Sequence, residues 1–264
     1  MKDRGGWWLG LWGVFTYGLL YAPIAVTVAF SFNAPRGRFN LVWHGFTLEH
    51  WLHPLRDRAL TEAFLASVAL AVCAAAVALV LGGLMALGLS RTQVRGARWI
   101  ELLVALPLTH PEIVLAAALL NLFVGLNAPR GPLTLLLAHS LFCLSYATLT
   151  LKARLAGFDW TLVLAARDLG ATPLAAFRRV TLPLLAPGLL AAALLSFSLS
   201  FDDYVISSFT AGETVTLPLY LAGAFQREIA PQIQVLSTVV LLVSAALMAL
   251  GLRRHDGEHG APPR

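Results

Sequence analysis

The sequence predicts an all-α membrane protein with about six transmembrane helices. Of its 264 residues, 58% are hydrophobic and only 12% are charged, whereas about a quarter of an ordinary soluble domain is charged. Six apolar stretches are each long enough to cross a bilayer, and the polar sequence between them is too short to wrap them in a soluble fold. The bilayer must therefore supply most of their burial.

Each apolar stretch suits one helical crossing. A hydrocarbon core of about 30 Å needs about 20 helical residues, and a β-barrel is excluded because the stretches do not alternate apolar with polar side chains. We predict one transmembrane domain over residues 1–264, with Pro107 and Pro111 as kink sites in its third span. The expected spans are 8–32, 63–89, 102–126, 133–151, 184–209 and 233–252.

The distribution of positive charge predicts the orientation. If six spans alternate from a cytoplasmic amino terminus, most of the 19 lysines and arginines fall in inner loops, as the positive-inside rule expects. The cations of the outer loops are Arg36, Arg38, Arg56, Arg58, Arg130 and Arg227. We therefore expect both termini in the cytoplasm, and we attribute the net charge of +5 to this bias and not to nucleic-acid binding.

The chain carries no recognisable catalytic motif. It lacks the phosphate-binding loop G-x-x-x-x-G-K-[ST], the dinucleotide motif G-x-G-x-x-G and the nucleophile elbow G-x-S-x-G. Cys73 and Cys143 lie within apolar spans and lack the spacing of metal ligands, as do the histidines of the first outer loop. We predict no enzymatic activity, no metal site and no cofactor in this chain.

The inner loop 152–183 is predicted to contain two short helices joined by a sharp turn. Asp159 can cap the first helix, and Gly170 can end it in a left-handed turn. Thr172 is a candidate N-cap for the second helix, with Pro173 at its first position, and this helix is expected to end where Pro183 opens the fifth span. Such a knob suits docking to a cytoplasmic partner; the alternative is a connector without a partner.

Three acidic residues lie inside the predicted spans. A charged side chain costs about 2.5 to 3.5 kcal/mol on insertion scales, so it usually faces a cavity or a partner. Glu112 lies near the middle of the third span, and Asp202 and Asp203 lie toward the outer end of the fifth, followed by Tyr204. Carboxylates beside an aromatic surface suit the path of a cation. However, adjacent side chains on a helix point about 100° apart, so Asp202 and Asp203 cannot both face the same point. The alternative is that one of them lies at the outer membrane interface and has no role in a pathway.

The inner loop resembles a family motif. Ala165-Ala166-Arg167-Asp168-Leu169-Gly170 is followed nine residues later by Val180-Thr181-Leu182-Pro183, which resembles the E-A-A-x-x-x-G-x9-I-x-L-P loop of bacterial ABC importer permeases. Leu164 stands where the family usually has Glu, so one polar contact to the ATPase is absent from the pattern. Within the family, segments 110–114, 152–159 and 200–209 are similar to those of spermidine/putrescine permease subunits of the C type.

The resemblance implies a permease subunit of an ATP-driven importer for polyamines, with the type I importer fold, in a bacterial cytoplasmic (inner) membrane. It implies pairing with a homologous permease or a second copy, two cytoplasmic ABC ATPase subunits that hydrolyse the ATP, and an extracytoplasmic substrate-binding protein. The implied coupling residues are Ala165, Ala166, Arg167, Asp168 and Gly170, and the implied pathway residues are Trp51, Glu112, Asp202, Asp203 and Tyr204.

Other functions fit parts of the pattern. Related permeases carry iron, thiamine or phosphonate on the same scaffold, so the fold alone names no substrate. A secondary cation transporter could bury the same carboxylates, but the sequence shows no inverted repeat and the loop motif would then be unexplained. An intramembrane aspartyl hydrolase needs two carboxyl groups that converge on one water, and sequence-adjacent aspartates are poorly placed for this.

Overall fold

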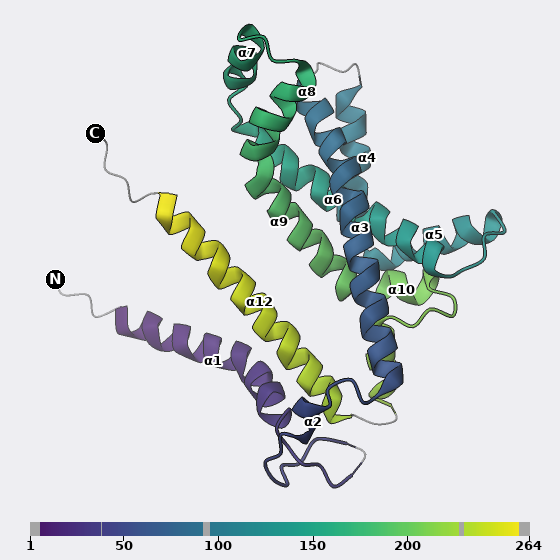
Figure 1. Ribbon diagram of the computed structural model, residues 1–264. Helices are drawn as coiled ribbons and strands as arrows, with labels where there is room; N and C mark the ends of the chain where they lie inside the picture. Colours follow the sequence, from purple (N-terminus) through teal and green to yellow (C-terminus); the bar gives the residue numbers. More distant parts are fainter. Residues whose placement is uncertain (1–5, 38, 92–95, 227–229, 259–264) are drawn as a thin grey trace. The chain divides into compact units, whose positions relative to one another are not determined.

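The computed structural model describes residues 6–37, 39–91, 96–226 and 230–258 (Figure 1). The described residues form helices joined by loops, with one isolated bridge between Asn33 and Phe46, so the prediction of an all-α fold is confirmed. Two compact units are present, Met1–Thr61 with Gly223–Arg264, and Glu62–Ala222. The prediction of a single transmembrane domain stays a prediction.

The first unit contains α1 (Gly6–Phe30), α2 (Glu49–Leu52) and α12 (Pro231–Glu258), and α12 contacts both of the others. The apolar side chains of α1 are largely exposed, as expected for a helix surrounded by lipid. Trp51, on α2, stacks on Phe32 with ring centroids 5.2 Å apart, and Phe32 stacks in turn on Phe46 at 5.6 Å.

Three amides fix the connection between α1 and α12. The Asn33 amide donates to Asn40 Oδ1 at 2.6 Å, and Asn40 Nδ2 donates to the Phe30 carbonyl oxygen at 2.9 Å and to Gln234 Oε1 at 2.6 Å. Both asparagines are fully buried. Because a buried amide without partners costs free energy, this network specifies one path for the loop that follows α1.

The second unit is a helical bundle. Its helices are α3 (Arg58–Arg91, from Glu62 onward), α4 (Ala97–Thr109), α5 (Glu112–Gly125), α6 (Pro132–Ala156), α7 (Thr161–Asp168), α8 (Pro173–Ala176), the π-helix η1 (Phe177–Thr181), α9 (Leu182–Phe201), α10 (Val205–Thr210) and α11 (Leu217–Ala224, as far as Ala222). The main pairing is between α6 and α9. Small residues such as Ala138, Ala147 and Ala192 are fully buried in the shared core, which allows the helices to approach closely, as is typical of membrane bundles.

Four helical segments of the described chain are long and apolar enough to cross a membrane: Gly10–Phe30, Arg58–Arg91, Pro132–Ala156 and Pro173–Phe201. A fifth results if α4 and α5, which are bent by 109° at their junction, count as one span. The apolar part of α12 that is described, Pro231–Ala246, is shorter. The chain is therefore a multi-pass membrane protein, and its sixth span stays a prediction.

The third predicted span is broken at Pro111. Proline disfavours helical geometry for the residue before it, and His110 is extended, with φ −96° and ψ 149°. The helix α5 then begins at Glu112, one residue after the proline. Pro107, the other expected kink site, lies inside α4.

The start of the fifth span differs from the prediction. The second loop helix was expected to end at Pro183, but the helical segment runs without interruption from Pro173 through η1 to Phe201. The wider turn explains the difference, because the Leu182 N–H donates to the Phe177 carbonyl oxygen five residues back. A π-helical turn just before Pro183 accommodates a proline that a regular helix would tolerate poorly.

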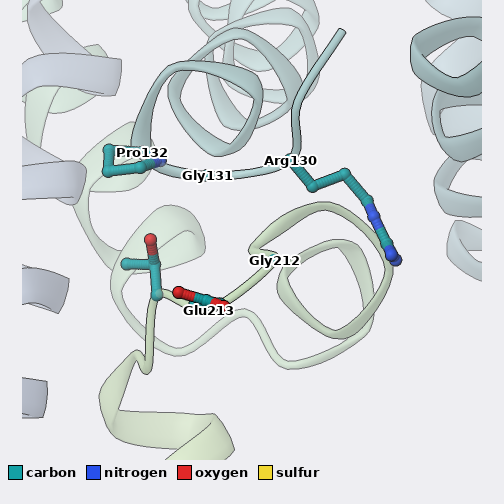
Figure 2. A pocket seen from close by; sticks show the side chains of 6 residues that line it. Arg130, Gly131, Pro132, Gly212 and Glu213 are labelled. Carbon is teal, nitrogen blue, oxygen red and sulfur yellow. The ribbon is translucent and has the colours of Figure 1, made fainter. Parts of the chain in front are cut away.

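The loops after α5 and α10 meet at the start of α6. Thr134 Oγ1 on α6 donates to the Thr210 carbonyl oxygen at 3.1 Å, and a cavity of about 630 Å³ opens between the two loops (Figure 2). Its lining residues are Arg130, Gly131, Pro132, Gly212, Glu213 and Thr214. Gly212 has a φ of +60°, and a Cβ there would overlap the Arg130 carbonyl group.

Gly212→Ala should therefore destabilise the protein. A left-handed conformation costs a non-glycine residue about 1 to 2 kcal/mol, and the overlap with Arg130 adds to this. The measurement is the thermal unfolding midpoint in detergent, with Gly131→Ala as the control, because a Cβ at Gly131 meets nothing within 4 Å. An equal midpoint for both variants would show that the two loops do not approach as described.

Candidate functional site

Two helix breaks meet in the middle of the second unit. The helix α9 ends at Phe201 and α10 begins at Val205, while α5 begins at Glu112. The helices α5 and α10 pack against each other, which brings Glu112 near Asp203. The amino-terminal end of a helix carries partial positive charge, which stabilises nearby carboxylates. The breaks therefore create a place where acidic groups are tolerated inside an apolar bundle.

Asp203 is the buried centre of this acidic group, with 6% of its surface exposed. Its Oδ1 accepts a hydrogen bond from the Ile206 N–H at 3.2 Å. Its Oδ2 accepts from the Ser207 N–H at 2.9 Å and from Ser207 Oγ at 3.1 Å. Asp203 thus caps α10, the role that a short acidic side chain performs best at a helix start.

The prediction of the fifth span assumed that Asp202 and Asp203 lie on one continuous helix. In the structure they lie instead between the end of α9 and the start of α10. Aspartate competes for nearby backbone N–H groups and so favours helix ends over helix interiors. The break gives the two side chains different environments. Asp203 is buried, whereas Asp202 and Tyr204 on either side of it are exposed and Glu112 is half-buried.

His139 on α6 belongs to the same group, although the sequence analysis did not single it out. Its Nε2 lies 3.2 Å from Asp203 Oδ2 and 3.1 Å from Ser207 Oγ. Its Nδ1 lies 2.8 Å from Ser200 Oγ on α9. The rule that drew attention to Glu112, an ionisable residue inside an apolar span, applies equally to His139 and could have found it.

Trp51 was predicted to belong with these residues but lies in the other compact unit. Its ring stacks on Phe32. The indole Nε1 is buried, with no hydrogen-bond partner in the described part of the structure. A role for Trp51 in a substrate pathway stays a prediction.

The inner loop has the geometry that the sequence predicts. Asp159 Oδ1 accepts hydrogen bonds from the Thr161 N–H at 2.9 Å and from Thr161 Oγ1 at 2.6 Å, and these bonds hold the pKa of Asp159 below its usual value. At the other end of α7, Gly170 has a φ of +89°. Its N–H donates to the Arg167 carbonyl oxygen at 2.9 Å, and the Ala171 N–H donates to the Ala166 carbonyl oxygen at 3.0 Å.

This pair of bonds is a Schellman ending, with glycine at the left-handed position. The second loop helix also starts as expected. Thr172 Oγ1 accepts a hydrogen bond from the Ala175 N–H at 3.3 Å, and Pro173 occupies the first helical position. Gly170 and Thr172 together turn the chain sharply from α7 into the long helical segment that ends at Phe201.

The loop exposes apolar side chains at its tip. Leu164, Leu169 and Leu174 have 56%, 90% and 64% of their surfaces exposed. Of the predicted coupling residues, Ala165, Arg167, Asp168 and Gly170 are exposed and Ala166 is half-buried. Leu164, at the position where the motif usually has Glu, therefore presents an apolar surface. Together the exposed leucines make this loop a candidate surface for a partner.

The base of the loop is fastened to the bundle. The guanidinium of Arg91, at the end of α3, lies 4.9 Å from the ring centroid of Trp160, a cation–π arrangement. Lys152 Nζ on α6 forms an ion pair with Glu101 Oε1 on α4 at 2.6 Å. The residue before α7 is therefore tied to the end of α3, and α6, which leads into the loop, is tied to α4.

No group of three or more histidine, cysteine or acidic residues suited to a metal ion occurs in the described ranges. Cys143 is buried and donates to the Ser196 carbonyl oxygen at 3.3 Å, while Cys73 is exposed.

Comparison with known proteins gives consistent matches. Residues 52–255 match the family described as binding-protein-dependent transport system inner membrane component. The chain is 37% identical to the spermidine/putrescine transport system permease protein PotC of Haemophilus influenzae, over 89% of this chain and 91% of that protein. It is 35% identical to PotC of Escherichia coli, over 93% and 90%. It is also 37% identical to the putrescine transport system permease protein PotI of Escherichia coli, over 86% and 82%.

Solved structures agree on the fold. A bacterial ABC transporter involved in the import of the acidic polysaccharide alginate matches with a TM-score of 0.66, over 99% of both chains, at 15% identity. An amino acid ABC transporter matches with a TM-score of 0.58, over 79% of this chain and all of that chain, at 17% identity.

Proposed function

The chain belongs to the family of binding-protein-dependent transport system inner membrane components, and we propose that it is the permease subunit of an ATP-driven importer of polyamines such as spermidine and putrescine. The sequence identity to permeases named for these substrates extends over most of the chain. The acidic group at the two helix breaks is the structural observation that supports a cationic substrate.

The chemistry of a polyamine fits this group. Polyamines carry several ammonium groups separated by short apolar stretches, so a path for them needs carboxylates with apolar or aromatic surface between them. Glu112 and Asp202 offer exposed or half-buried carboxylates, and Tyr204 offers an exposed ring beside them. Asp203 completes the negative charge from its buried position. Trp51 is proposed as a further aromatic contact from the outer loop.

The inner loop is proposed to couple this path to ATP hydrolysis on a separate subunit. Its exposed leucines suit docking into a groove of a cytoplasmic ATPase, with Ala165, Ala166, Arg167, Asp168 and Gly170 as coupling residues. The helical segment from Pro173 to Phe201 connects the loop to the break at Asp202 without interruption. Movement of the docked loop would therefore reach the acidic group through one helix.

The remaining parts of the assembly follow from this scheme. A second permease, either homologous or identical, would complete the pathway, and an extracytoplasmic binding protein would deliver the substrate. We propose that the chain lies in a bacterial inner membrane with both termini and the loop 152–183 in the cytoplasm, as the positive-inside rule predicts.

Importers of other solutes are the alternative class. Phosphonate would be repelled by three carboxylates on the pathway, whereas iron and thiamine are cationic and would not be. A secondary transporter is less favoured because it has no use for an exposed apolar loop that is fastened to the bundle.

The direct test is copurification of the tagged chain from its native membranes, followed by measurement of ATPase activity. We expect an ABC ATPase to copurify, and its turnover to rise with spermidine-loaded binding protein. Recovery of the ATPase without stimulation by any polyamine would contradict the substrate class, and recovery of the chain alone would contradict the importer.

Glu112→Gln should weaken uptake at limiting polyamine by about tenfold, since loss of one well-placed ionic contact is worth about 1.4 kcal/mol. The yield of the complex should not change, because the amide keeps the shape of the side chain. The measurement is initial uptake of labelled spermidine. Glu49→Gln is the control, because Glu49 pairs with Arg56 on an exposed surface of the other unit. Normal uptake by Glu112→Gln would assign Glu112 a structural role only.

Gly170→Ala should weaken coupling. A side chain at φ +89° costs about 1 to 2 kcal/mol, which corresponds to a population change of about 5- to 30-fold for the docking-competent loop. ATPase retention on the purified permease and uptake should both fall. Gly157→Ala is the matched control, because Gly157 has a φ of −101° and open space around it. If both variants retain the ATPase and transport equally well, the loop is not the coupling element.

A further inference from the structure

His139 is a buried titratable side chain of the second unit that the proposed pathway does not use. It lies on α6, at the point where α6 packs against α9 and α10. Its side chain and that of Asp203 each have 1% of their surface exposed. A histidine in the apolar interior of a membrane bundle is costly unless both ring nitrogens have partners.

The partners of His139 define how its ring is held. An ionised Asp203 offers only acceptors, so the Nε2 atom that faces it carries a proton and donates. The Ser207 hydroxyl donates to Asp203 Oδ2 at 3.1 Å and can accept from the same Nε2. At the other side of the ring, Ser200 Oγ lies 2.8 Å from Nδ1. The ring therefore joins α6, α9 and α10 through three polar contacts.

The contacts also define what Asp203 can do. Its Oδ2 receives the Ser207 N–H, the Ser207 hydroxyl and His139 Nε2, and its Oδ1 receives the Ile206 N–H. With this many donors, the carboxylate is held inward and has little capacity left for direct contact with a substrate. The neighbouring Asp202 and Tyr204 are exposed.

We propose that His139 is a positioning residue of the cation pathway. It clamps Asp203 at the start of α10, and this clamp sets the direction in which the exposed Asp202 and Tyr204 point and the place where Glu112 meets the acidic group. The inference rests on the proposed function, and it divides the acidic residues into one that is an anchor, Asp203, and two that meet the substrate, Glu112 and Asp202.

Two substitutions of His139 separate positioning from packing. In His139→Gln the amide nitrogen can occupy the place of Nε2 and still donate to Asp203, whereas in His139→Asn the shorter amide reaches only the place of Nδ1, toward Ser200. Spermidine uptake is measured in proteoliposomes that contain the assembled importer with its ATPase and binding protein. We expect His139→Asn to raise the half-saturating spermidine concentration by about tenfold and His139→Gln to remain within about twofold of the wild type.

A second pair, on α9, tests how the same ring is held without changing the histidine. Ser200→Ala removes the partner of Nδ1 and should raise the half-saturating concentration about threefold, in the same direction as His139→Asn. Ser196→Ala is the control one turn earlier, because the Ser196 hydroxyl is buried without a hydrogen-bond partner in the described part of the chain, and its loss should change nothing. If His139→Asn does not assemble, the comparison of Ser200→Ala with Ser196→Ala decides alone.

Three results would overturn the inference. Equal half-saturation for the wild type and for both His139 variants would mean that the clamp has no influence on the site. Equal impairment by Asn and Gln, with Ser200→Ala unaffected, would mean that His139 only fills space. Absence of spermidine uptake by the wild-type importer would reject the proposed function itself, and the inference with it.

Discussion

A buried carboxylate in the middle of a membrane bundle is the constraint on which the rest of the structure depends. Asp203 cannot be left without partners in this environment, because an unpaired charge there costs several kcal/mol. Its partners come from two helices. His139 lies on α6, and the backbone N–H and hydroxyl of Ser207 lie on α10. The break between α9 and α10 exists where these groups converge, and the break is what exposes Asp202 and Tyr204.

The helical segment that includes α9 connects this site to the inner loop. Because η1 accommodates Pro183, the segment from Pro173 to Phe201 is one helical element and not the two that a proline would be expected to separate. One of its ends follows the left-handed turn at Gly170, and the other precedes the acidic break. A bundle packed through small residues transmits displacement as a shift of whole helices, since its core has little space for independent side-chain movement.

The sequence predicted what depends on local chemistry. Asp159, Gly170 and Thr172 act through atoms a few residues away, so their capping roles follow from residue type and spacing, and the break at Pro111 follows from the geometry before a proline. The clamp on Asp203 depends on His139, more than sixty residues earlier in the chain, and the amide network of the first unit joins Asn40 to Gln234. No local pattern marks such contacts. The helix break after Phe201 was missed because apolar residues stand on both sides of Asp202 and Asp203, and hydropathy records burial but not the hydrogen bonds that end a helix.

The central claim is that a polyvalent ammonium cation crosses the membrane past the acidic group at the helix breaks, and that ATP hydrolysis drives this transport. Its most direct test is accumulation of labelled spermidine in proteoliposomes that contain the assembled importer, with ATP on the side of the inner loop and loaded binding protein on the other. The account predicts ATP-dependent accumulation that unlabelled putrescine reduces by competition and that an anionic solute of similar length leaves unchanged. Accumulation without ATP, or equal competition by the anionic solute, would contradict it.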